Sequence, residues 1–374
     1  MHSEASPSRG ATPPDFERDV HCLLGLPIDA INLAEAERRI RAAVAARLPC
    51  FMSTPNVNFL IQSRSDDAFR NAVLHSDLSV ADGMPLVWLA RLIGIPIRER
   101  VAGSSLFEAL RDGRGRPLAV YFFGGGEGVA EAAARRLGLG AKGVVCVGYQ
   151  SPGFGSVEDM SSEETIGRIN DSNADLLVVS LGARKGQAWI ECNRPRLNVP
   201  VVSHLGAVVD FGAGTVRRAP AWMQRAGLEW LWRIKEQPGL WPRYLNDGFA
   251  LAALLVTRVL PYAWYARRHA AGSAGEGYVE AREAEREYTI ALRGAWTHAN
   301  LTRLRRCFAA AAQSGKDVRL DMTAVSHVDS AFVGLAMLLL GYLQQRGRRL
   351  AILPVPRPVR RVIEYCCAEF LCHA

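Results

Sequence analysis

The sequence predicts an α/β fold in which a sheet with crossover helices carries a basic helical appendage and is followed by a smaller α/β domain. Short β-rich runs alternate with helical patterns from residue 23 to about residue 214. Basic residues and tryptophan then concentrate in residues 217–268, and a small-residue run at 270–277 precedes a further unit. The length of 374 residues and the 49% hydrophobic content suffice for two cores.

The N-terminal residues 1–20 are polar and rich in proline, serine and charge, and they lack the apolar stretch of a signal peptide. We expect them to form a disordered leader. The eight cysteines show no CxxC pair and no regular framework, so they are expected to be reduced and mostly buried. This favours a cytoplasmic protein.

The first domain is expected over residues 21–214, with helices such as residues 33–48 and 129–137 between its strands. In sheets of this kind nucleotides bind beyond the carboxyl ends of the strands. Chemistry is therefore expected in the loops that begin at Thr54, Asp82, Gly124, Gly148, Gly182 and Leu205. The predicted strands cover residues 51–57, 78–81, 118–123, 144–147, 176–181 and 201–204.

Asp82, in the run SVADGMP, is the sharpest catalytic candidate. A carboxylate directly after an apolar strand lies at the ligand edge of the sheet, where it can accept a proton from an attacking hydroxyl. On composition alone, a helix N-cap or turn is the commoner role of such an Asp. Three polar residues follow another strand, namely Thr54, Asn56 and Asn58. Their side chains can either bind a ligand or cap a helix or turn.

The glycine cluster of FFGGGEGVAEAAARRL allows a phosphate to meet the start of a helix, although a tight turn explains it equally well. Arg184, Lys185 and Gln187 follow the strand at 176–181, where they can bind anionic or hydroxylated groups or remain solvated. The sequence shows no DxD after a strand, no HExxH and no clustered His and Cys. We therefore expect no metal and no other cofactor, so that a leaving diphosphate is neutralised by Arg, Lys and helix N-termini.

The segment 215–269 forms the predicted basic appendage. Between residues 217 and 268 it holds nine Lys or Arg against three acidic residues, and five of the eight tryptophans. Its apolar run 249–266 contains Arg258 and Pro261. The run is therefore a poor candidate for a membrane-spanning helix and a fair candidate for a helix that lies at the membrane surface. An ordinary basic hairpin packed on the sheet is the alternative. The net charge of +8 also suits nucleic acid, but the tryptophan-rich context favours a membrane, so no nucleic-acid partner is expected.

Residues 270–279 are expected to be a flexible linker, and residues 280–374 a second domain. Its strands are predicted at 287–293, 318–322 and 349–353, and its helices at 301–314, 331–345 and 359–366.

Several ordered motifs resemble those of the WecG/TagA/CpsF glycosyltransferases, among which are the N-acetylmannosaminyltransferases and GumM-like enzymes. They are TPNVNFL, VADGMPLVWLARLIG, RERVAGSSLFEAL, GGGEGVAEAAARRL, LLVVSLGARKGQAWI and HLGAVVDFGAGTVRRAPAWMQRAGLEWLWRI, followed by PRYL. The resemblance implies a Rossmann-like core and an inverting transferase. Such an enzyme moves an N-acetylmannosamine-type or glucose-type sugar from a UDP-sugar to a polyprenyl-diphosphate-linked saccharide in cell-surface polysaccharide synthesis.

The same resemblance implies roles for individual residues. Asp82 would be the general base, Thr54 and Asn56 would line the sugar and acceptor site, and Arg100 with Arg217 or Arg218 would bind phosphates. The appendage would close the site and contact the inner face of the cell membrane, so that the protein is a peripheral membrane protein. Many members of the family have PKQE where this chain has Arg184, Lys185, Gly186 and Gln187, which makes Gln187 the candidate to replace the usual glutamine.

The second domain resembles a STAS domain, with a strand, the Asp329-Ser330 loop, a helix and another strand in order. The resemblance implies docking of a protein partner and makes Ser330 a candidate phosphorylation site, because a phosphate there would meet a helix N-terminus. Ala331 and Phe332 depart from the usual phosphorylated loop, and a plain N-cap is the alternative. The alternative for the whole chain is a catalytically silent scaffold that binds nucleotide-sugar or lipid and recruits partners through this domain.

Overall fold

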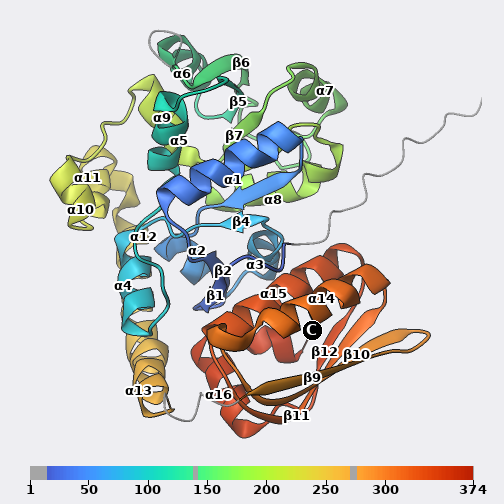
Figure 1. Cartoon of the computed structure of the whole chain (residues 1–374). Helices are drawn as coiled ribbons and strands as arrows, with labels where there is room; N and C mark the ends of the chain where they lie inside the picture. The colour runs from blue at the N-terminus through green and yellow to red at the C-terminus, as the bar shows by residue number, and fades with distance from the viewer. Residues whose placement is uncertain (1–14, 138–141, 270–275, 374) are drawn as a thin grey trace, which may run out of the picture.

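The computed structural model describes residues 15–137, 142–269 and 276–373, and it contains two α/β units joined by a helical appendage (Figure 1). The first unit is built on a six-stranded sheet and the second on a four-stranded sheet. The α/β fold class is therefore confirmed. Most of the predicted leader and residues 270–275 of the predicted linker lie outside the described residues.

The sheet of the first domain is parallel throughout, and its strand order is β4-β3-β8-β7-β5-β6. Each strand lies at a predicted position. The strand β3 is shorter than predicted because Pro55 cannot donate to a ladder and Asn56 already caps the next helix. The strands are β3 (Cys50–Ser53), β4 (Leu78–Ser79), β5 (Leu118–Gly124), β6 (Val144–Gln150), β7 (Leu176–Ser180) and β8 (Val201–His204).

Side chains alternate between the two faces of this sheet, as the pleat requires. Phe122 and Val178 point into a core beneath α1, α5, α6 and α9, whereas Phe123 and Val179 point into a second core beneath α7 and α8. Both faces are thus covered by helices. The helices are α1 (Leu33–Ala46), α2 (Val57–Gln62), α3 (Asp67–Leu74), α4 (Met84–Leu92), α5 (Gly103–Asp112), α6 (Val129–Leu137), α7 (Glu163–Asp171), α8 (Ala183–Asn193) and α9 (Gly206–Ala213).

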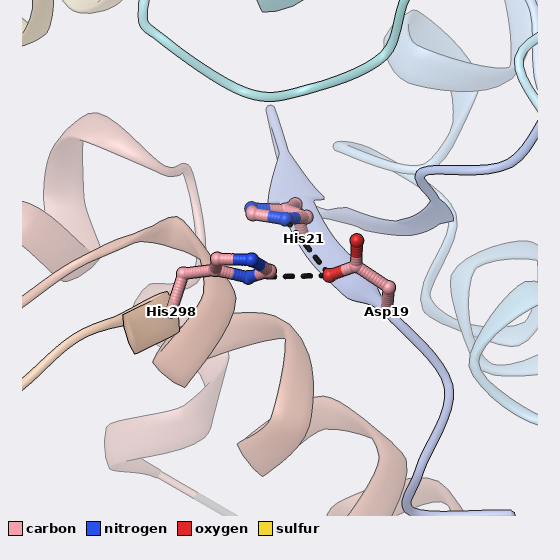
Figure 2. A group of neighbouring side chains, drawn as sticks. All are labelled: Asp19, His21 and His298. Atoms are coloured by element: carbon pink, nitrogen blue, oxygen red, sulfur yellow. Dashed lines mark ion pairs between the residues drawn. The ribbon is translucent and has the colours of Figure 1, made fainter. Parts of the chain in front are cut away.

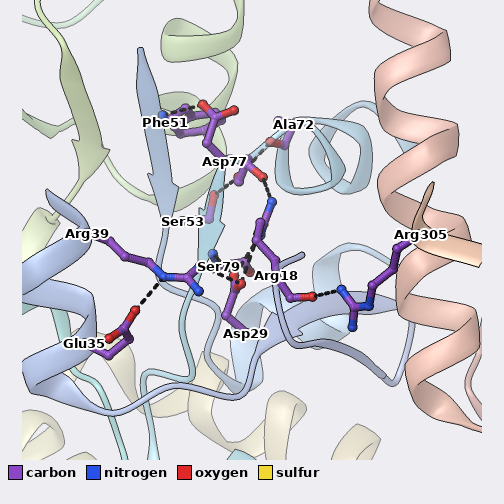
Figure 3. Close-up of polar contacts among 11 residues, drawn as sticks. Arg18, Asp29, Glu35, Arg39, Phe51, Ser53, Ala72, Asp77, Ser79 and Arg305 are labelled. Atoms are coloured by element: carbon purple, nitrogen blue, oxygen red, sulfur yellow. Dashed lines mark hydrogen bonds and ion pairs between the residues drawn. The ribbon is translucent and has the colours of Figure 1, made fainter. Parts of the chain in front are cut away.

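A short antiparallel hairpin, β1 (Val20–Leu23) and β2 (Leu26–Asp29), precedes the sheet and was not predicted. Leu24 and Gly25 both have positive φ, which is the backbone of a two-residue hairpin turn. The hairpin is fastened by Arg18, whose Nε lies 3.0 Å from Asp29 Oδ1 and whose second terminal nitrogen lies 2.7 Å from Oδ2 (Figure 3). The Asp29 carboxylate also accepts from the backbone N–H of Ser79, so both charges are compensated in a buried position.

The second domain has the strand order β12-β11-β10-β9, with β9 antiparallel to β10 and the other pairs parallel. The strand β9 begins inside the segment predicted to be a linker. Its charged, exposed sequence at the edge of the sheet carries little strand signal. The elements are β9 (Gly277–Glu283), β10 (Glu287–Trp296), α14 (Thr302–Ser314), β11 (Asp317–Val328), α15 (Ser330–Gln345), β12 (Leu350–Ile352) and α16 (Arg357–Tyr365).

The two domains are packed together through α15, which lies between the second sheet and the hairpin of the first domain (Figure 1). Two glycines one heptad apart permit this approach: a Cβ on Gly334 would lie 2.7 Å from the Val20 carbonyl oxygen, and one on Gly341 would lie 2.8 Å from that of Leu74. Phe16 is buried against Phe308 of α14. The described N-terminal residues thus belong to the interface.

The appendage consists of α10 (Ala221–Arg225), α11 (Glu229–Glu236), α12 (Trp241–Leu254), a π-helical turn at Leu255–Val259, and α13 (Leu260–His269). Among the described residues, Pro238–His269 is the one helical run long and apolar enough to cross a membrane, judged by length and composition. One side of it is buried against both domains, through Leu254, Val259 and Tyr262. The opposite side is exposed, and its large apolar residues are Trp241, Leu245, Phe249, Val256, Leu260 and Trp264.

Candidate active site

Asp82 lies just beyond the carboxyl end of β4, at the edge of the sheet where ligands bind in this class of fold. Its backbone N–H donates to the carbonyl of Pro55, 2.8 Å away, which ties the loop after β4 to the loop after β3. The following helix α4 has Gly83 at its N-cap and, within the described residues, no side-chain cap. The Asp82 carboxylate is therefore not used to cap α4.

Helix α5 begins beside Asp82, and the backbone N–H of its first residue, Gly103, interacts with the carboxylate. A Cβ on Gly103 would lie 2.6 Å from Leu205 Cδ2 and 3.6 Å from Thr54 Cγ2. Glycine thus lets α5 approach the loops after β3 and β8 without displacing the Leu205 side chain. The contacts bring together two of the predicted residues, Asp82 and Thr54, at the N-terminus of one helix.

The acidity of Asp82 is changed by this environment. Burial raises the pKa of Asp82 to about 6, against the opposing effect of the Arg100 charge, and the Glu229 carboxylate adds to the rise while Arg233 and the Gly103 amide oppose it. A carboxyl group with this pKa is mostly ionised at neutral pH and is more basic than an ordinary aspartate. Those are the properties of a general base.

The appendage supplies charged groups around Asp82. Arg100 forms an ion pair with Glu229, the first residue of α11, and its other terminal nitrogen lies 3.5 Å from Gln224 Oε1 of α10. Arg100 thus connects the loop before α5 to the appendage. No motif singled out Glu229 or Arg233, because their proximity to Asp82 depends on how the appendage folds back.

The two arginines of the RRAP motif have different surroundings. Arg218 donates to Ser105 Oγ at 2.7 Å and pairs with Glu108, so it lies against the first turns of α5. Arg217 is exposed, and its backbone carbonyl accepts from Trp232 Nε1 at 2.9 Å. Arg218 is therefore held close to the N-terminus of α5, while the Arg217 side chain remains in solvent.

Asn56 and Asn58 both have structural partners. Asn56 caps α2, with its side-chain oxygen 3.2 Å from the backbone nitrogen of Phe59. Asn58 donates to Asp247 of α12 at 3.1 Å, which fixes the appendage to α2. The capping explanation holds for Asn56 in this structure, but a cap uses only its oxygen and leaves the amide group for a ligand.

Gln187 is fully buried within α8, and its amide nitrogen lies 3.2 Å from Ser53 Oγ at the end of β3. Its side chain thus contacts the last residue of β3, which directly precedes Thr54. The Ser53 Oγ in turn lies 2.6 Å from Ser76 Oγ. Gln187 is therefore buried and held by Ser53 at this end of the sheet, and its role in ligand binding stays a prediction.

His204 was missed by sequence reasoning. It is the last residue of β8, is almost fully buried, and its Nε2 has no hydrogen-bond partner among the described residues. Burial lowers the pKa of His204 to about 4, so its ring is neutral at pH 7. A Cβ on Gly186 would lie 2.2 Å from His204 Cδ2, so the glycine that departs from the family pattern makes room for this imidazole.

The glycine cluster after β5 serves a close backbone crossing. A Cβ on Gly124 would lie 2.4 Å from the Ser180 carbonyl oxygen, and the Gly125 N–H donates to the same oxygen at 2.8 Å. The tight-turn explanation therefore accounts for Gly124. Lys185 donates to the Gly155 carbonyl at 2.8 Å, and Arg184 pairs with Asp66, so both are held by protein groups.

Comparison with known proteins agrees with this geometry. The description "Glycosyl transferase WecG/TagA/CpsF family" matches residues 21–263, which include Asp82, its neighbours and the appendage. The chain belongs to this family. The resemblance seen in the motifs is thereby confirmed, and the chain is a glycosyltransferase.

Two curated relatives have the same printed name, N-acetylglucosaminyldiphosphoundecaprenol N-acetyl-beta-D-mannosaminyltransferase. The protein from Bacillus spizizenii is 28% identical over 55% of this chain and 78% of its own length. The protein from Bacillus subtilis is 26% identical over 56% of this chain and 80% of its own length. Residues 279–367 match a family described as "Mlab, STAS domain", which confirms the second resemblance.

Proposed function

We propose that this glycosyltransferase moves a sugar, N-acetylmannosamine-type or glucose-type, from a UDP-sugar to a polyprenyl-diphosphate-linked saccharide, with inversion at the anomeric carbon and with Asp82 as general base. One observation carries the proposal: within the family-matched domain, Asp82 lies at the ligand edge of the sheet with its pKa raised to about 6. The names of the two Bacillus relatives support a lipid-diphosphate acceptor. Production of cell-surface polysaccharide follows from such an acceptor.

In this mechanism Asp82 removes the proton from the acceptor hydroxyl as that oxygen attacks the sugar. The departing UDP acquires negative charge, which the N-terminus of α5 and the guanidinium groups of Arg100 and Arg218 would stabilise. Arg217 is exposed and free to meet the acceptor diphosphate. Thr54 and the free amide of Asn56 would bind sugar or acceptor hydroxyls.

Attachment to the inner face of the cell membrane is part of the proposal. The exposed apolar side of Pro238–His269 is flanked by basic residues, among them Arg243, Arg267 and Arg268. Such a helix, lying in the headgroup region, would hold the site beside a membrane-embedded acceptor. The free state of all eight cysteines, which lie in the described residues, accords with a reducing compartment.

The test is release of UDP by the full-length protein with a UDP-sugar and a short-chain polyprenyl-diphosphate acceptor. We expect release only when both substrates are present, and a loss of about 10²–10⁴-fold in Asp82→Asn, the usual contribution of a general base. Asp112→Asn is the matched control, because Asp112 is an exposed aspartate at the far end of α5. Binding of UDP-sugar without turnover by any acceptor would instead favour a silent scaffold.

A further inference from the structure

Three side chains with metal-binding groups meet where the two domains touch. Asp19 and His21 come from the start of the hairpin, and His298 opens the 3-10 turn His298–Asn300 of the second domain (Figure 2). Asp19 Oδ1 lies 3.2 Å from His21 Nε2 and 3.3 Å from His298 Nδ1. All three ligand atoms lie within 4.8 Å of one another, so one small ion can reach them with modest side-chain movement.

The His21 ring has an unsatisfied nitrogen that points into this group. The His21 side chain is only 3% exposed, and in the described part of the chain its Nε2 and Asp19 Oδ1 have no polar partner outside this group of three residues. On its other edge, His21 Nδ1 lies 3.2 Å from Ser330 Oγ. With the proton on Nδ1, the lone pair of Nε2 faces a carboxylate, an arrangement that a cation between them would stabilise.

We propose that Asp19, His21 and His298 form a site for one zinc-class divalent cation that fastens the STAS domain to the transferase domain. Two imidazoles and one carboxylate are donors typical of zinc and its neighbours in the first transition row, whereas calcium and magnesium prefer oxygen alone. Zinc–ligand bonds of about 2.0–2.1 Å in a tetrahedron place ligands about 3.3–3.4 Å apart. The two contacts of Asp19 already have nearly this length.

The surroundings supply the support that metal ligands usually have. Ser330 Oγ can accept a hydrogen bond from Nδ1–H of His21 and so hold Nε2 in the ligating form. Asp329 Oδ2 accepts from the backbone N–H of His298 at 2.8 Å and fixes the turn that presents it. His21 and His298 also line a cavity of about 350 Å³, which leaves room for a water molecule as the fourth ligand.

The cation would act as a link between domains, because two ligands belong to one domain and the third to the other. Anything that binds only the docked arrangement stabilises it by mass action. The sequence could not reveal this site, since His298 is distant from Asp19 and His21 along the chain and no ligand spacing results. The inference does not depend on the proposed transfer reaction.

The experiment uses the full-length protein without a polyhistidine tag, freed of metal by chelation. Zinc binding is measured by titration calorimetry and by the metal retained after dialysis, and cobalt serves as a spectroscopic probe of tetrahedral coordination. His298→Ala removes the ligand of the second domain. His373→Ala is the matched control, because His373 is exposed and lies outside the group.

We expect one zinc per chain in the wild type and in His373→Ala, with a higher melting temperature in the presence of zinc. His298→Ala should bind zinc at least tenfold more weakly, and zinc should no longer raise its melting temperature. Its melting temperature without metal should stay near that of the wild type. Ser330→Ala should weaken binding about 10–100-fold, as loss of a ligand's supporting partner usually does. Equal zinc affinity in His298→Ala and the wild type, or no zinc bound by the wild type, would overturn the proposal.

Discussion

Asp82 differs from the exposed acids of this chain in that its ionisation is opposed by burial, which raises its pKa to about 6. Since a general base must be ionised to act, kcat/KM should be constant above pH 7 and fall about tenfold per pH unit below pH 6. The raised pKa also means that the stability contributed by this carboxyl group is full below its unfolded pKa of 3.8 and is lost as the pH rises to about 6, so that the ionised carboxylate lowers stability by a constant amount above that pH. Asp82→Asn should therefore unfold at the same temperature as the wild type, or higher, at pH 7.5.

Initial rates at subsaturating substrate between pH 5 and pH 9, with melting curves of both proteins at each pH, check this prediction. If kcat/KM instead falls only below about pH 4, the essential carboxyl group has the pKa of an ordinary aspartate. A melting temperature of Asp82→Asn well below that of the wild type at pH 7.5 would assign the residue a structural role.

At the residue scale the sequence could locate Asp82 and Thr54, because residues directly after a strand must lie at the sheet edge. It could not locate His204 or the burial of Gln187. Whether a side chain near a strand end points outward or downward depends on the helix packed beneath, here α8 with Gly186 against the His204 ring. Such contacts between distant segments leave no periodic signal.

Helix α15 provides a prediction at the scale of elements. Gly334 lies so close to the Val20 carbonyl that a Cβ would be 2.7 Å from its oxygen, whereas Gly167, inside α7, has open space around the same position. Gly334→Ala should therefore destabilise the protein by about 1–3 kcal/mol through overpacking. Gly167→Ala, the matched control, should stabilise it by up to about 1 kcal/mol through helix propensity.

Urea unfolding of both variants measures these changes. If both alanine substitutions raised the free energy of unfolding equally, α15 would not be packed closely against the hairpin in solution.

The long helix of the appendage supports a second prediction at this scale. Phe249 is 75% exposed and Val256 is 64% exposed, on the outward side of the helix. The double variant Phe249→Ser with Val256→Ser should lose co-sedimentation with anionic phospholipid vesicles, because the apolar contact with the bilayer is removed without a change of charge. Thr257→Ser with Ala253→Ser, changes at exposed positions that remove no large apolar side chain, should retain binding.

Binding to DNA that matches or exceeds binding to vesicles would contradict a membrane role and favour nucleic acid. Unchanged vesicle binding in the double variant would place the membrane contact elsewhere on the protein.

Helices and central strands were predictable because apolar periodicity over buried positions is strong, as in α6, which spans the predicted residues 129–137. The hairpin β1–β2 and the edge strand β9 were not. The hairpin turns at Leu24, a residue type that rarely adopts positive φ, and β9 is mostly exposed and charged. In both cases the partner strand, and not local sequence, determines the structure.

For the molecule as a whole, Ser330 of the STAS domain lies at the interface with the hairpin of the first domain, where its side chain is buried and faces His21. A kinase would reach this hydroxyl only after the domains separate. Phosphorylation of Ser330 remains a proposal, and it would add negative charge at the interface between the two domains.

The central claim is sugar transfer to a lipid-linked acceptor, and mass spectrometry of the acceptor tests it most directly. Purified protein is incubated with a short-chain polyprenyl-diphosphate N-acetylglucosamine and a panel of UDP-sugars, including UDP-N-acetylmannosamine and UDP-glucose. We expect an acceptor heavier by one sugar residue with one of these donors, and no such product with Asp82→Asn. An acceptor of unchanged mass with every donor, or a product formed equally well by Asp82→Asn, would contradict it.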